Sequence, residues 1–526
     1  MTTHISAPTM VEPRTLWEKS VRGRRGVALP EAGVPERPLP ELLGADQVRA
    51  DPAPLPEISE PELVRHFVTT SQENMSIDTT FYPLGSCTMK HNPKLNERVA
   101  ALPGFADLHP LQDADGAQGT LQVMWELQRD IAEIAGLTEA TLQPAAGAAG
   151  EFTGLLLIKA FHGDRGEHDQ RREIVIPDAA HGTNPASVTL AGYVPVKVLT
   201  SSEGGVDLDD LRAKVGPQTA ALMLTNPNTL GLFDPNIAEI AGVLHEAGAL
   251  LYYDGANLNP VMGVSRPGDM GFDVVHFNLH KSFSTPHGGG GPGAGPVAVS
   301  DRLAPYLPQP TVRRAEDGRF ELDFSREKSI GRVRSFHGNT GVLVRAYTYI
   351  RSLGPEGLAD AAGTSVLNAN YLRSRLVKAG YHAPYGERCM HEFVLSARDM
   401  KRSNGVRAHD IAKRLMDFGM HPPTVYFPLL VEECLLIEPT ETETLETLNR
   451  FADAMEQIAR EAAEEPEVVR EAPHTTRLGR LDEARAVKQP VLTALHHLGD
   501  DPDISPGEDR LGFEAARGEP GFDPAA

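Results

Sequence analysis

The sequence contains few cysteines, and they lie far apart. Only three occur in 526 residues (Cys87, Cys389 and Cys434), and no two form a C-x-x-C pair. This spacing encodes neither a disulfide framework nor a thiolate zinc site, so we expect no bound metal. The same scarcity favours a reducing compartment.

Long apolar runs and an excess of basic residues are also absent. No run of about eighteen apolar residues occurs, and the first twenty residues lack the apolar segment of a signal peptide. Acidic residues outnumber basic ones by 72 to 50, a net charge of −22, so no surface that neutralises phosphates is indicated. We therefore expect a cytoplasmic protein that binds neither membrane nor nucleic acid.

The composition is that of a folded protein with several parts. A hydrophobic share of 40% and a charged share of 23% exclude collagen, coiled-coil and disordered classes. Proline recurs every few residues up to about residue 60, which prevents a long helix there and favours an extended arm. We expect four segments: an arm and linker (1–115), a large domain (116–345), a small C-terminal domain (346–480), and an extension (481–526) with a disordered tail from about residue 499.

Short apolar runs alternate with helical patterns through the predicted large domain. The runs are residues 173–177, 194–199, 220–225, 249–253, 273–277 and 296–299. Between two of them, apolar residues recur at helical spacing from Ile237 to Ala247, and the pattern ends at Gly248. This alternation is typical of βαβ units, so the fold class is α/β with a large, mostly parallel sheet.

The pattern of predicted elements changes after about residue 346, where helices become longer and strands fewer. Helices are predicted near 362–379 and over 407–418, and strands over 392–397 and 434–439. A last helix is expected with a capping box at Thr440-x-x-Glu443 and an apolar face of Leu445, Leu448, Phe451, Met455 and Ile458. These elements indicate a smaller α+β domain.

A lysine at the end of a strand is the first candidate for chemistry. The run DVVHF leads directly into Asn278-Leu279-His280-Lys281 and then into a glycine-dense loop, with glycines at 288–291, 293 and 295. A buried lysine loses its proton easily, and a neutral amine can form a Schiff base with an aldehyde cofactor. Lys281 is thus a candidate anchor for pyridoxal phosphate, with an ordinary surface lysine and a flexible hairpin as the alternatives.

Asp254 supplies a second element. It follows the strand ALLYY, where a carboxylate could pair with a protonated pyridine nitrogen, and Ala256 is small enough to lie flat against a ring. A plain Asp-Gly turn is the alternative. The position one strand before Lys281 favours the functional interpretation, because facing groups in such sheets come from neighbouring strand ends.

Two further segments fit the same site. His181 follows the strand at 173–177 and could stack on a cofactor ring, although a solvated loop histidine is the alternative. Small residues at 145–150, among them Gly147, Ala148 and Ala149, precede an apolar helix whose free N–H groups and dipole suit a phosphate. The pattern lacks G-x-G-x-x-G, so it is not a dinucleotide fingerprint.

Four motifs carry a resemblance to a known family. They are FYPLGSCTMKHNPK (81–94), HGTNPAS (181–187), YYDGANLN (252–259) and NLHKSFSTPHGGGGPG (278–293). In this order and spacing they resemble the glycine dehydrogenase (decarboxylating) P-proteins of the glycine cleavage system, in particular the lysine-bearing second subunit of the two-subunit form. The similarity covers roughly residues 10 to 490.

The resemblance implies a fold-type I pyridoxal phosphate enzyme. Lys281 would hold the cofactor, Asp254 would face the pyridine nitrogen, and His181 and Ala256 would lie on opposite faces of the ring. The 147–149 backbone would bind the phosphate, because Ala146 and Ala149 stand where longer members carry a hydroxyl and an amide. Thr225, Asn226 and His280 complete the implied cofactor site.

The resemblance also implies a reaction and partners. Glycine would lose carbon dioxide, and its aminomethyl group would pass to the lipoyl group of the H-protein. A companion first subunit is expected, with two copies of each chain. Other possibilities are another fold-type I enzyme, such as a cysteine desulfurase or an aminotransferase, and a non-catalytic assembly subunit.

Some residues near these motifs have open roles. Ser86, Cys87 and Thr88 lie in a loop suited to closing over a small carboxylate substrate. Cys87 is either a reactive thiol or an inert buried one. Arg332, Arg334 and His337 are candidate phosphate or carboxylate contacts, within this chain or toward a neighbouring subunit, with surface pairing as the alternative.

Overall fold

The computed structural model describes residues 15–51, 53, 55–288 and 293–490. The described residues divide into two compact units, one ending at residue 75 and resuming at residue 481, the other spanning residues 76–480. No described helix combines the length and the apolar character needed to cross a membrane. The predicted disordered tail and four residues of the glycine-dense loop (289–292) lie outside the described residues. The predicted four-part division stays a prediction.

The smaller unit contains short helices where prolines are frequent. Its elements are α1 (Leu16–Lys19), α2 (Leu39–Leu43), η1 (Ala45–Gln47), α3 (Glu60–Gln72) and α17 (Glu483–Lys488). Helix α1 begins with a capping box, in which Thr15 Oγ1 accepts from the Glu18 N–H at 3.3 Å and Glu18 accepts from the Thr15 N–H at 2.5 Å. Only α3 reaches thirteen residues, because no proline follows its first turn.

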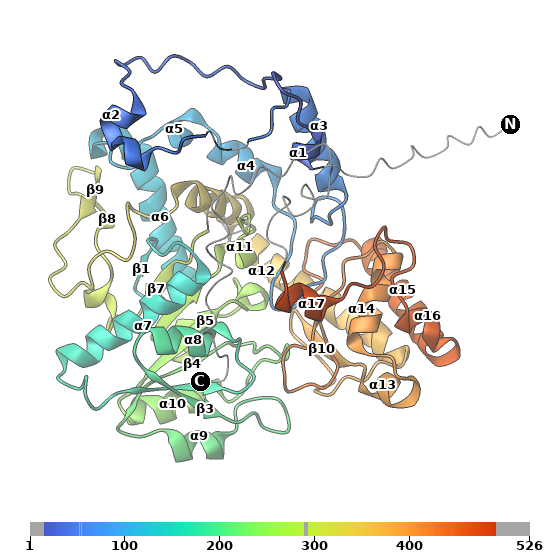
Figure 1. The fold of residues 1–526 in the computed structure, drawn as a ribbon. Coiled ribbons are helices and arrows are strands. Elements are labelled where there is room, and N and C mark those ends of the chain that lie inside the picture. The colour runs from blue at the N-terminus through green and yellow to red at the C-terminus, as the bar shows by residue number, and fades with distance from the viewer. Residues whose placement is uncertain (1–14, 52, 54, 289–292, 491–526) are drawn as a thin grey trace. The chain divides into compact units, whose positions relative to one another are not determined.

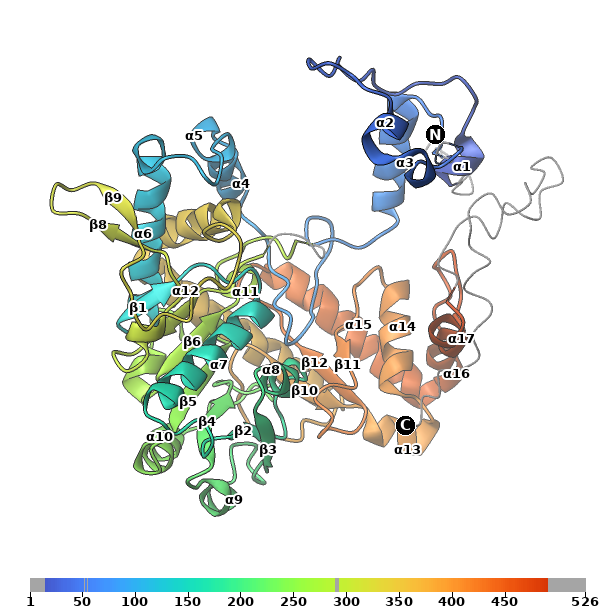
Figure 2. The same ribbon diagram turned by 60° about the vertical axis from the view of Figure 1, so that its left-hand side comes forward.

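The larger unit is built on a seven-stranded sheet of order β1-β7-β6-β5-β4-β2-β3 (Figures 1 and 2). Its strands are β1 (Glu139–Thr141), β2 (Glu173–Pro177), β3 (Val194–Val198), β4 (Thr219–Leu224), β5 (Leu250–Gly255), β6 (Val274–Phe277) and β7 (Val297–Val299). The six predicted runs all form strands, and the five strands β6, β5, β4, β2 and β3 run parallel to one another. The α/β fold class with a mostly parallel sheet is confirmed.

Strand β7 runs antiparallel to β6, which the alternating pattern did not predict. A parallel return usually runs through a helix that crosses the face of the sheet. Among the described residues between β6 and β7 the only helix is α11 (Leu279–Ser282), which has four residues and is too short for such a crossing. The chain therefore returns along the neighbouring strand in the opposite direction.

Helices cover both faces of the large sheet. Successive residues of β5 point to opposite faces: Leu251 and Tyr253 pack against α6, α10 and α12, and Leu250 and Tyr252 pack against α7 and α8. These helices are α6 (Gln118–Ala135), α7 (Gly147–Asp164), α8 (Thr183–Leu190), α10 (Ile237–Glu246) and α12 (Thr340–Lys378). Helix α10 is the predicted crossover helix, and Gly248 beyond its end has a φ of +73°.

Shorter elements complete the larger unit around the sheet. They are α4 (Lys94–Ala100), α5 (Pro103–Ala106), η2 (Ala114–Ala117), α9 (Leu208–Lys214), η3 (Asn259–Val261), η4 (Pro267–Met270), η5 (Ala304–Tyr306), β8 (Thr311–Arg314) and β9 (Phe320–Asp323). Strands β8 and β9 form an antiparallel hairpin of their own. None of these elements belongs to the seven-stranded sheet.

A second, smaller sheet lies beside the first in both views (Figures 1 and 2). It is antiparallel, in the order β10-β12-β11, with β10 (Phe393–Ser396), β11 (Thr424–Val425) and β12 (Cys434–Ile437). The surrounding helices are α13 (Arg398–Asn404), α14 (Ala408–Asp417), α15 (Leu445–Glu464) and α16 (Pro466–Arg470). The second half of α12 also packs into this core.

Two predicted helix starts are wrong. Helix α12 begins at Thr340 rather than near 362 and is interrupted at Gly354, whose φ is 64°. Helix α15 is capped by Thr444, whose Oγ1 accepts from the Thr447 N–H at 3.2 Å, and not by Thr440. Thr440 has a φ of 61°, which is incompatible with the extended backbone of an N-cap. Leu445 is consequently exposed, while the other four residues of the predicted apolar face are buried.

Candidate active site

Lys281 and Asp254 stand at the carboxyl ends of adjacent parallel strands. Asp254 belongs to β5, and Lys281 belongs to α11, which begins two residues after β6. Both residues are buried, at 2% and 9% exposure. The Lys281 Nζ donates a hydrogen bond to the Ser86 carbonyl oxygen at 2.8 Å. An amine and a carboxylate are thus held at the sheet edge where α/β proteins bind ligands.

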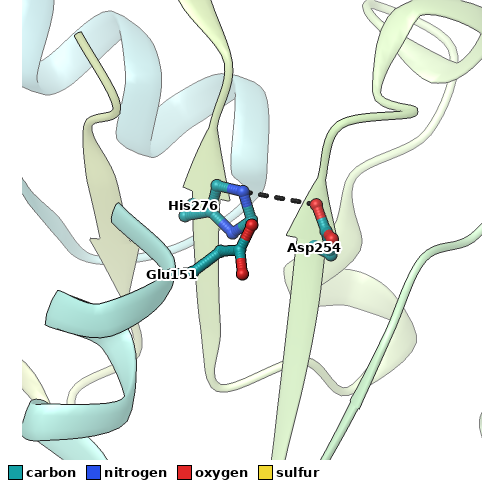
Figure 3. A group of neighbouring side chains, drawn as sticks. All are labelled: Glu151, Asp254 and His276. Atoms are coloured by element: carbon teal, nitrogen blue, oxygen red, sulfur yellow. Dashed lines mark ion pairs between the residues drawn. The ribbon is translucent and has the colours of Figure 1, made fainter. Parts of the chain in front are cut away.

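Three groups hold the Asp254 carboxylate. His276 Nε2 lies 3.2 Å from Oδ1, the Asn184 Nδ2 donates to Oδ2 at 2.8 Å, and the Ala256 N–H donates to Oδ1 at 3.0 Å. Figure 3 shows Asp254 and His276 facing each other from neighbouring strands. Burial alone would raise the pKa of Asp254, but His276 and the two donors outweigh burial and lower it. The carboxyl is therefore ionised.

Glu151 in α7 organises the loop that carries His181. Its carboxylate accepts from the Thr183 hydroxyl at 2.9 Å and from the Ser187 hydroxyl at 2.8 Å, both in α8. The Thr183 N–H in turn donates to His181 Nδ1 at 3.3 Å. Burial lowers the pKa of His181, so its ring is neutral. Sequence reasoning missed Glu151, whose only signal is an acidic residue among the small and apolar residues at the start of the helix.

The first turn of α7 lies beside the lysine segment. The N–H groups of Gly147, Ala148 and Ala149 precede the first helical bond, which the Gly150 N–H donates to Ala146 at 2.9 Å. A Cβ added to Gly147 would lie 2.1 Å from the Asn278 Oδ1, so the approach of this turn requires glycine. An 18-residue helix with free amides at this end suits an anion.

Thr225 and Asn226 are buried nearby, and His280 is partly buried. Asn226 follows β4, accepts from the Asp234 N–H at 2.8 Å through Oδ1, and has no partner for Nδ2 among the described residues. Burial lowers the pKa of His280 to about 3, and the centre of its ring lies 4.7 Å from that of His287. His280 is thus a neutral ring beside Lys281.

The loop Ser86-Cys87-Thr88 crosses the lysine in a strained conformation. Ser86 has a φ of 64° and Thr88 a φ of 22°, values that favour glycine. Two glutamates that sequence reasoning missed hold it: the Ser86 N–H donates to Glu392 at 2.6 Å, and the Thr88 hydroxyl donates to Glu438 at 2.6 Å. Burial raises the pKa of the Cys87 thiol, which therefore stays protonated at neutral pH.

Two groups of side chains have metal-ligand spacing. They are Glu151, Asp254 and His276, and His391, Glu392 and Glu438, with ligand atoms within 4.8 Å of one another in each group. In the first group, the carboxylates already accept hydrogen bonds from Asn184, Thr183, Ser187 and Ala256. These bonds account for that group without a metal.

Arg332, Arg334 and His337 have surroundings that differ from those of Lys281. Arg334 and His337 line a cavity of about 420 Å³ between α6 and the start of α12. Arg332 lies over the Phe324 ring at 5.8 Å. The cavity lining includes neither Lys281 nor Asp254, so Arg334 and His337 belong to a different hollow from the lysine.

Comparison with known proteins adds two family matches. Residues 361–475 match the family described as glycine dehydrogenase, C-terminal domain, and residues 154–294 match aminotransferase class-V. The first match covers the small sheet, and the second covers the segment from α7 to the lysine. The small sheet and the large sheet thus match different families.

Curated relatives are similar over most of the chain. A probable glycine dehydrogenase (decarboxylating) subunit 2 of Halalkalibacterium halodurans is 58% identical over 477 residues, which are 91% of this chain and 97% of that one. The protein of the same name from Exiguobacterium sibiricum is 58% identical over 481 residues, with the same coverage. Both span nearly the whole of each protein.

Solved structures share the fold at lower identity. The inhibitor-bound glycine decarboxylase (P-protein) of the glycine cleavage system has a TM-score of 0.65 at 23% identity, covering 80% of this chain and 93% of that one. The apo cysteine desulfurase of Thermococcus onnurineus has a TM-score of 0.56 at 17% identity, covering 76% and 98%. At such identities the likeness concerns the fold.

Proposed function

The chain belongs to the glycine dehydrogenase (decarboxylating) subunit 2 family, and we propose that Lys281, Asp254 and His181 are its catalytic residues for the decarboxylation of glycine. The cofactor is pyridoxal phosphate. The observation that carries the assignment of residues is the buried amine of Lys281 beside the ionised Asp254 on adjacent strand ends. The enzyme is thus an oxidoreductase of the glycine cleavage system.

The residues present fit this cofactor. The free amides at the start of α7 suit its phosphate, and the approach of this turn to Asn278 leaves no room for a Cβ at Gly147. Asp254 offers a buried carboxylate to a ring nitrogen, and Ala256 offers a small side chain beside the ring. Thr225, Asn226 and His280 complete the proposed cofactor site, and Asn226 Nδ2 is a buried donor with no partner among the residues that the structure describes.

Different side chains have different roles in the proposed reaction. When bound, pyridoxal phosphate supplies an aldehyde that reacts with amines and a ring that accepts the electron pair of a breaking bond. Asp254 would keep a proton on the ring nitrogen, because its ionised carboxylate is held by His276 and Asn184. His181 would offer a neutral ring to the cofactor, and the Ser86–Thr88 loop would receive the small substrate.

Partners follow from the family rather than from contacts in this chain. The designation of its relatives as subunit 2 implies a companion subunit. We propose two copies of each chain, a cytoplasmic location, and transfer of the aminomethyl group to the lipoyl group of an H-protein. Arg332, Arg334 and His337, which lie away from Lys281, are candidates to face the companion subunit.

The alternative activities are less well supported. A cysteine desulfurase shares the fold at 17% identity, whereas the subunit 2 relatives are 58% identical over nearly their whole length. An assembly subunit without catalysis has no use for a buried lysine held against Ser86. The glycine-specific activity is therefore the better proposal.

The test is release of labelled carbon dioxide from carboxyl-labelled glycine. The chain is supplied with pyridoxal phosphate and lipoylated H-protein, with and without the companion subunit. We expect release that depends on the companion. A parallel panel of cysteine, alanine and aspartate tests the alternatives, and preference for any of these would overturn the glycine assignment.

Borohydride reduction separates the residue from the reaction. Reduction should fix the cofactor on the peptide that contains Lys281 in the wild type and not in Lys281→Arg. Lys90→Arg is the matched control, because Lys90 is also buried but is paired with Glu441. Fixation on Lys90, or on no lysine, would refute the role of Lys281 whatever the carbon dioxide assay gives.

A further inference from the structure

Two buried carboxyl groups of the small sheet face each other beside the site. Glu392 immediately precedes β10 and Glu438 immediately follows β12. These strands are antiparallel, with Phe393 opposite Ile437, so the two glutamates occupy the next pair of positions. Their exposures are 0% and 1%. The fold thus brings two acids together at one end of the small sheet.

The hydrogen bonds to these acids come from uncharged donors. Glu392 accepts from the Ser86 N–H at 2.6 Å and from the Asn257 Nδ2 at 3.1 Å. Glu438 accepts from the Thr88 hydroxyl and N–H and from the Asn259 Nδ2 at 3.1 Å. Two full negative charges at this spacing and depth are costly without a cation bound to either.

Both acids respond to this environment in the same direction. Burial and then the neighbouring Glu438 raise the pKa of Glu392, and burial raises the pKa of Glu438. Burial also lowers the pKa of His391 to about 3, so that ring is neutral and neutralises neither acid. The other titratable groups around Lys281 are Cys87, His181, Asp254, His280 and His287.

The loop connects this acid pair to the lysine through two short routes. Ser86 donates its N–H to Glu392 and accepts from Lys281 Nζ through its carbonyl oxygen, at 2.6 and 2.8 Å. The side-chain amide of Asn259 bridges Glu438 and Ser282. Its Nδ2 donates to Glu438 at 3.1 Å, and its Oδ1 accepts from the Ser282 hydroxyl at 2.9 Å. The small sheet therefore fixes the residues on both sides of the amine.

We propose that Glu392 and Glu438 are positioning residues that share one proton, clamp the Ser86–Thr88 loop, and set the charge of the Lys281 amine. As a singly protonated pair they present one negative charge to the amine. When one acid is replaced by glutamine, the other ionises and the charge facing Lys281 is unchanged. Only the loss of both acids removes it. The inference deepens the proposed function, because it concerns the amine of the same site.

The test measures the protonation of Lys281 without glycine or cofactor. The full-length, cofactor-free chain is labelled with a trace of isotopic acetic anhydride between pH 6 and 11, and the Lys281 peptide is quantified by mass spectrometry against a reference amine. The variants are Glu392→Gln, Glu438→Gln and the double variant. Glu433→Gln is the matched control, a buried acid of the same sheet that is paired with Lys401 at 2.7 Å.

If the two acids share one proton, the single variants and the double variant should differ in the pH midpoint of Lys281 labelling. Each single variant should keep the midpoint of labelling within about 0.5 pH unit of the wild type, whereas the double variant should lower it by about one unit or more. A full drop in each single variant would show two independent carboxylates and overturn the proposal, even if the double variant failed to fold. An unchanged double variant would also overturn it. Since no glycine is used, neither result depends on the carbon dioxide assay.

Discussion

The Nζ atom of Lys281 lies 2.8 Å from the carbonyl oxygen of Ser86, a residue 195 positions earlier in the chain. This bond satisfies a buried amine with a backbone acceptor and leaves the nearby carboxylates to other donors. Ser86 adopts a left-handed φ of 64°, which aims its carbonyl and its N–H at different partners. Among the described residues, a ligand would have to displace only this one hydrogen bond to free the amine of Lys281.

Replacing Asp254 by asparagine should slow glycine decarboxylation by about 10² to 10³, the usual effect of removing one preorganised electrostatic contact. The amide keeps the volume but not the charge that protects the ring proton. The measurement is the initial rate of labelled carbon dioxide release, with bound cofactor followed by absorbance. Asp273→Asn is the control, since Asp273 is equally buried but pairs with His245 and Arg302. A wild-type rate in Asp254→Asn would refute the assignment.

The buried ring of His391 should make the protein less stable in acid. Its folded pKa of about 3 is below the unfolded value of about 6.5, so its contribution is complete above pH 6.5 and is lost as the pH falls toward 3. In the wild type this histidine should lower the unfolding free energy by up to about 1.4 kcal/mol for each pH unit between pH 6 and 5. In His391→Met this part of the pH dependence should disappear. Urea unfolding at pH 7, 6 and 5 measures it. The exposed His168→Met should leave the slope unchanged.

Cys87 should react slowly with iodoacetamide. Burial raises the pKa of its thiol, and the thiolate is the reactive form, so alkylation at pH 8 should be slower than that of free cysteine and should rise through pH 9. Cys389 and Cys434 should be slower still, because burial raises the pKa of each to about 12. Peptide mass spectrometry ranks the three thiols. Rapid labelling of Cys87 at pH 7 would instead indicate an activated thiol.

The buried pair Lys90–Glu441 should contribute to stability rather than to chemistry. Lys90 Nζ lies 2.6 Å from Glu441 and donates to the Ser282 carbonyl oxygen at 3.0 Å. Burial alone would lower the pKa of Lys90, but Glu441 and Tyr349 raise it, so the pair is charged. Lys90→Met should cost about 3 to 5 kcal/mol by leaving an unpaired carboxylate. The variant Lys90→Met/Glu441→Leu should recover part of this loss in urea unfolding.

The sequence predicted the large sheet well because its strands obey simple rules. The central parallel strands β4, β5 and β6 are buried on both faces and therefore appear as short apolar runs, and the residues that follow such runs gather at one edge of the sheet. Lys281, Asp254 and His181 were found by this logic. The direction of β7 was not predicted, because an apolar run in the sequence does not show whether the strand is parallel or antiparallel to its neighbour.

The acids of the small sheet could not be predicted in the same way. Glu392 stands directly before an apolar run and Glu438 directly after one, positions where charged residues are usually solvated. Their burial depends on a loop three hundred residues away in sequence, which supplies the N–H groups of Ser86 and Thr88. Local pattern contains no information about such a partner. The Thr440 cap was wrong for a related reason, since its left-handed backbone is set by tertiary contacts.

Helix α12 has a mechanical consequence for the enzyme. Beyond its interruption at Gly354 it continues to Lys378, a rod of roughly 36 Å at 1.5 Å per residue. Leu358 and Ala362 anchor one part of this rod under the large sheet, and Leu372 and Leu376 anchor the other part in the small core. One rigid helix thus belongs to both cores. The acid pair beside the small sheet and Lys281 beside the large sheet are therefore joined by this helix as well as by the Ser86–Thr88 loop.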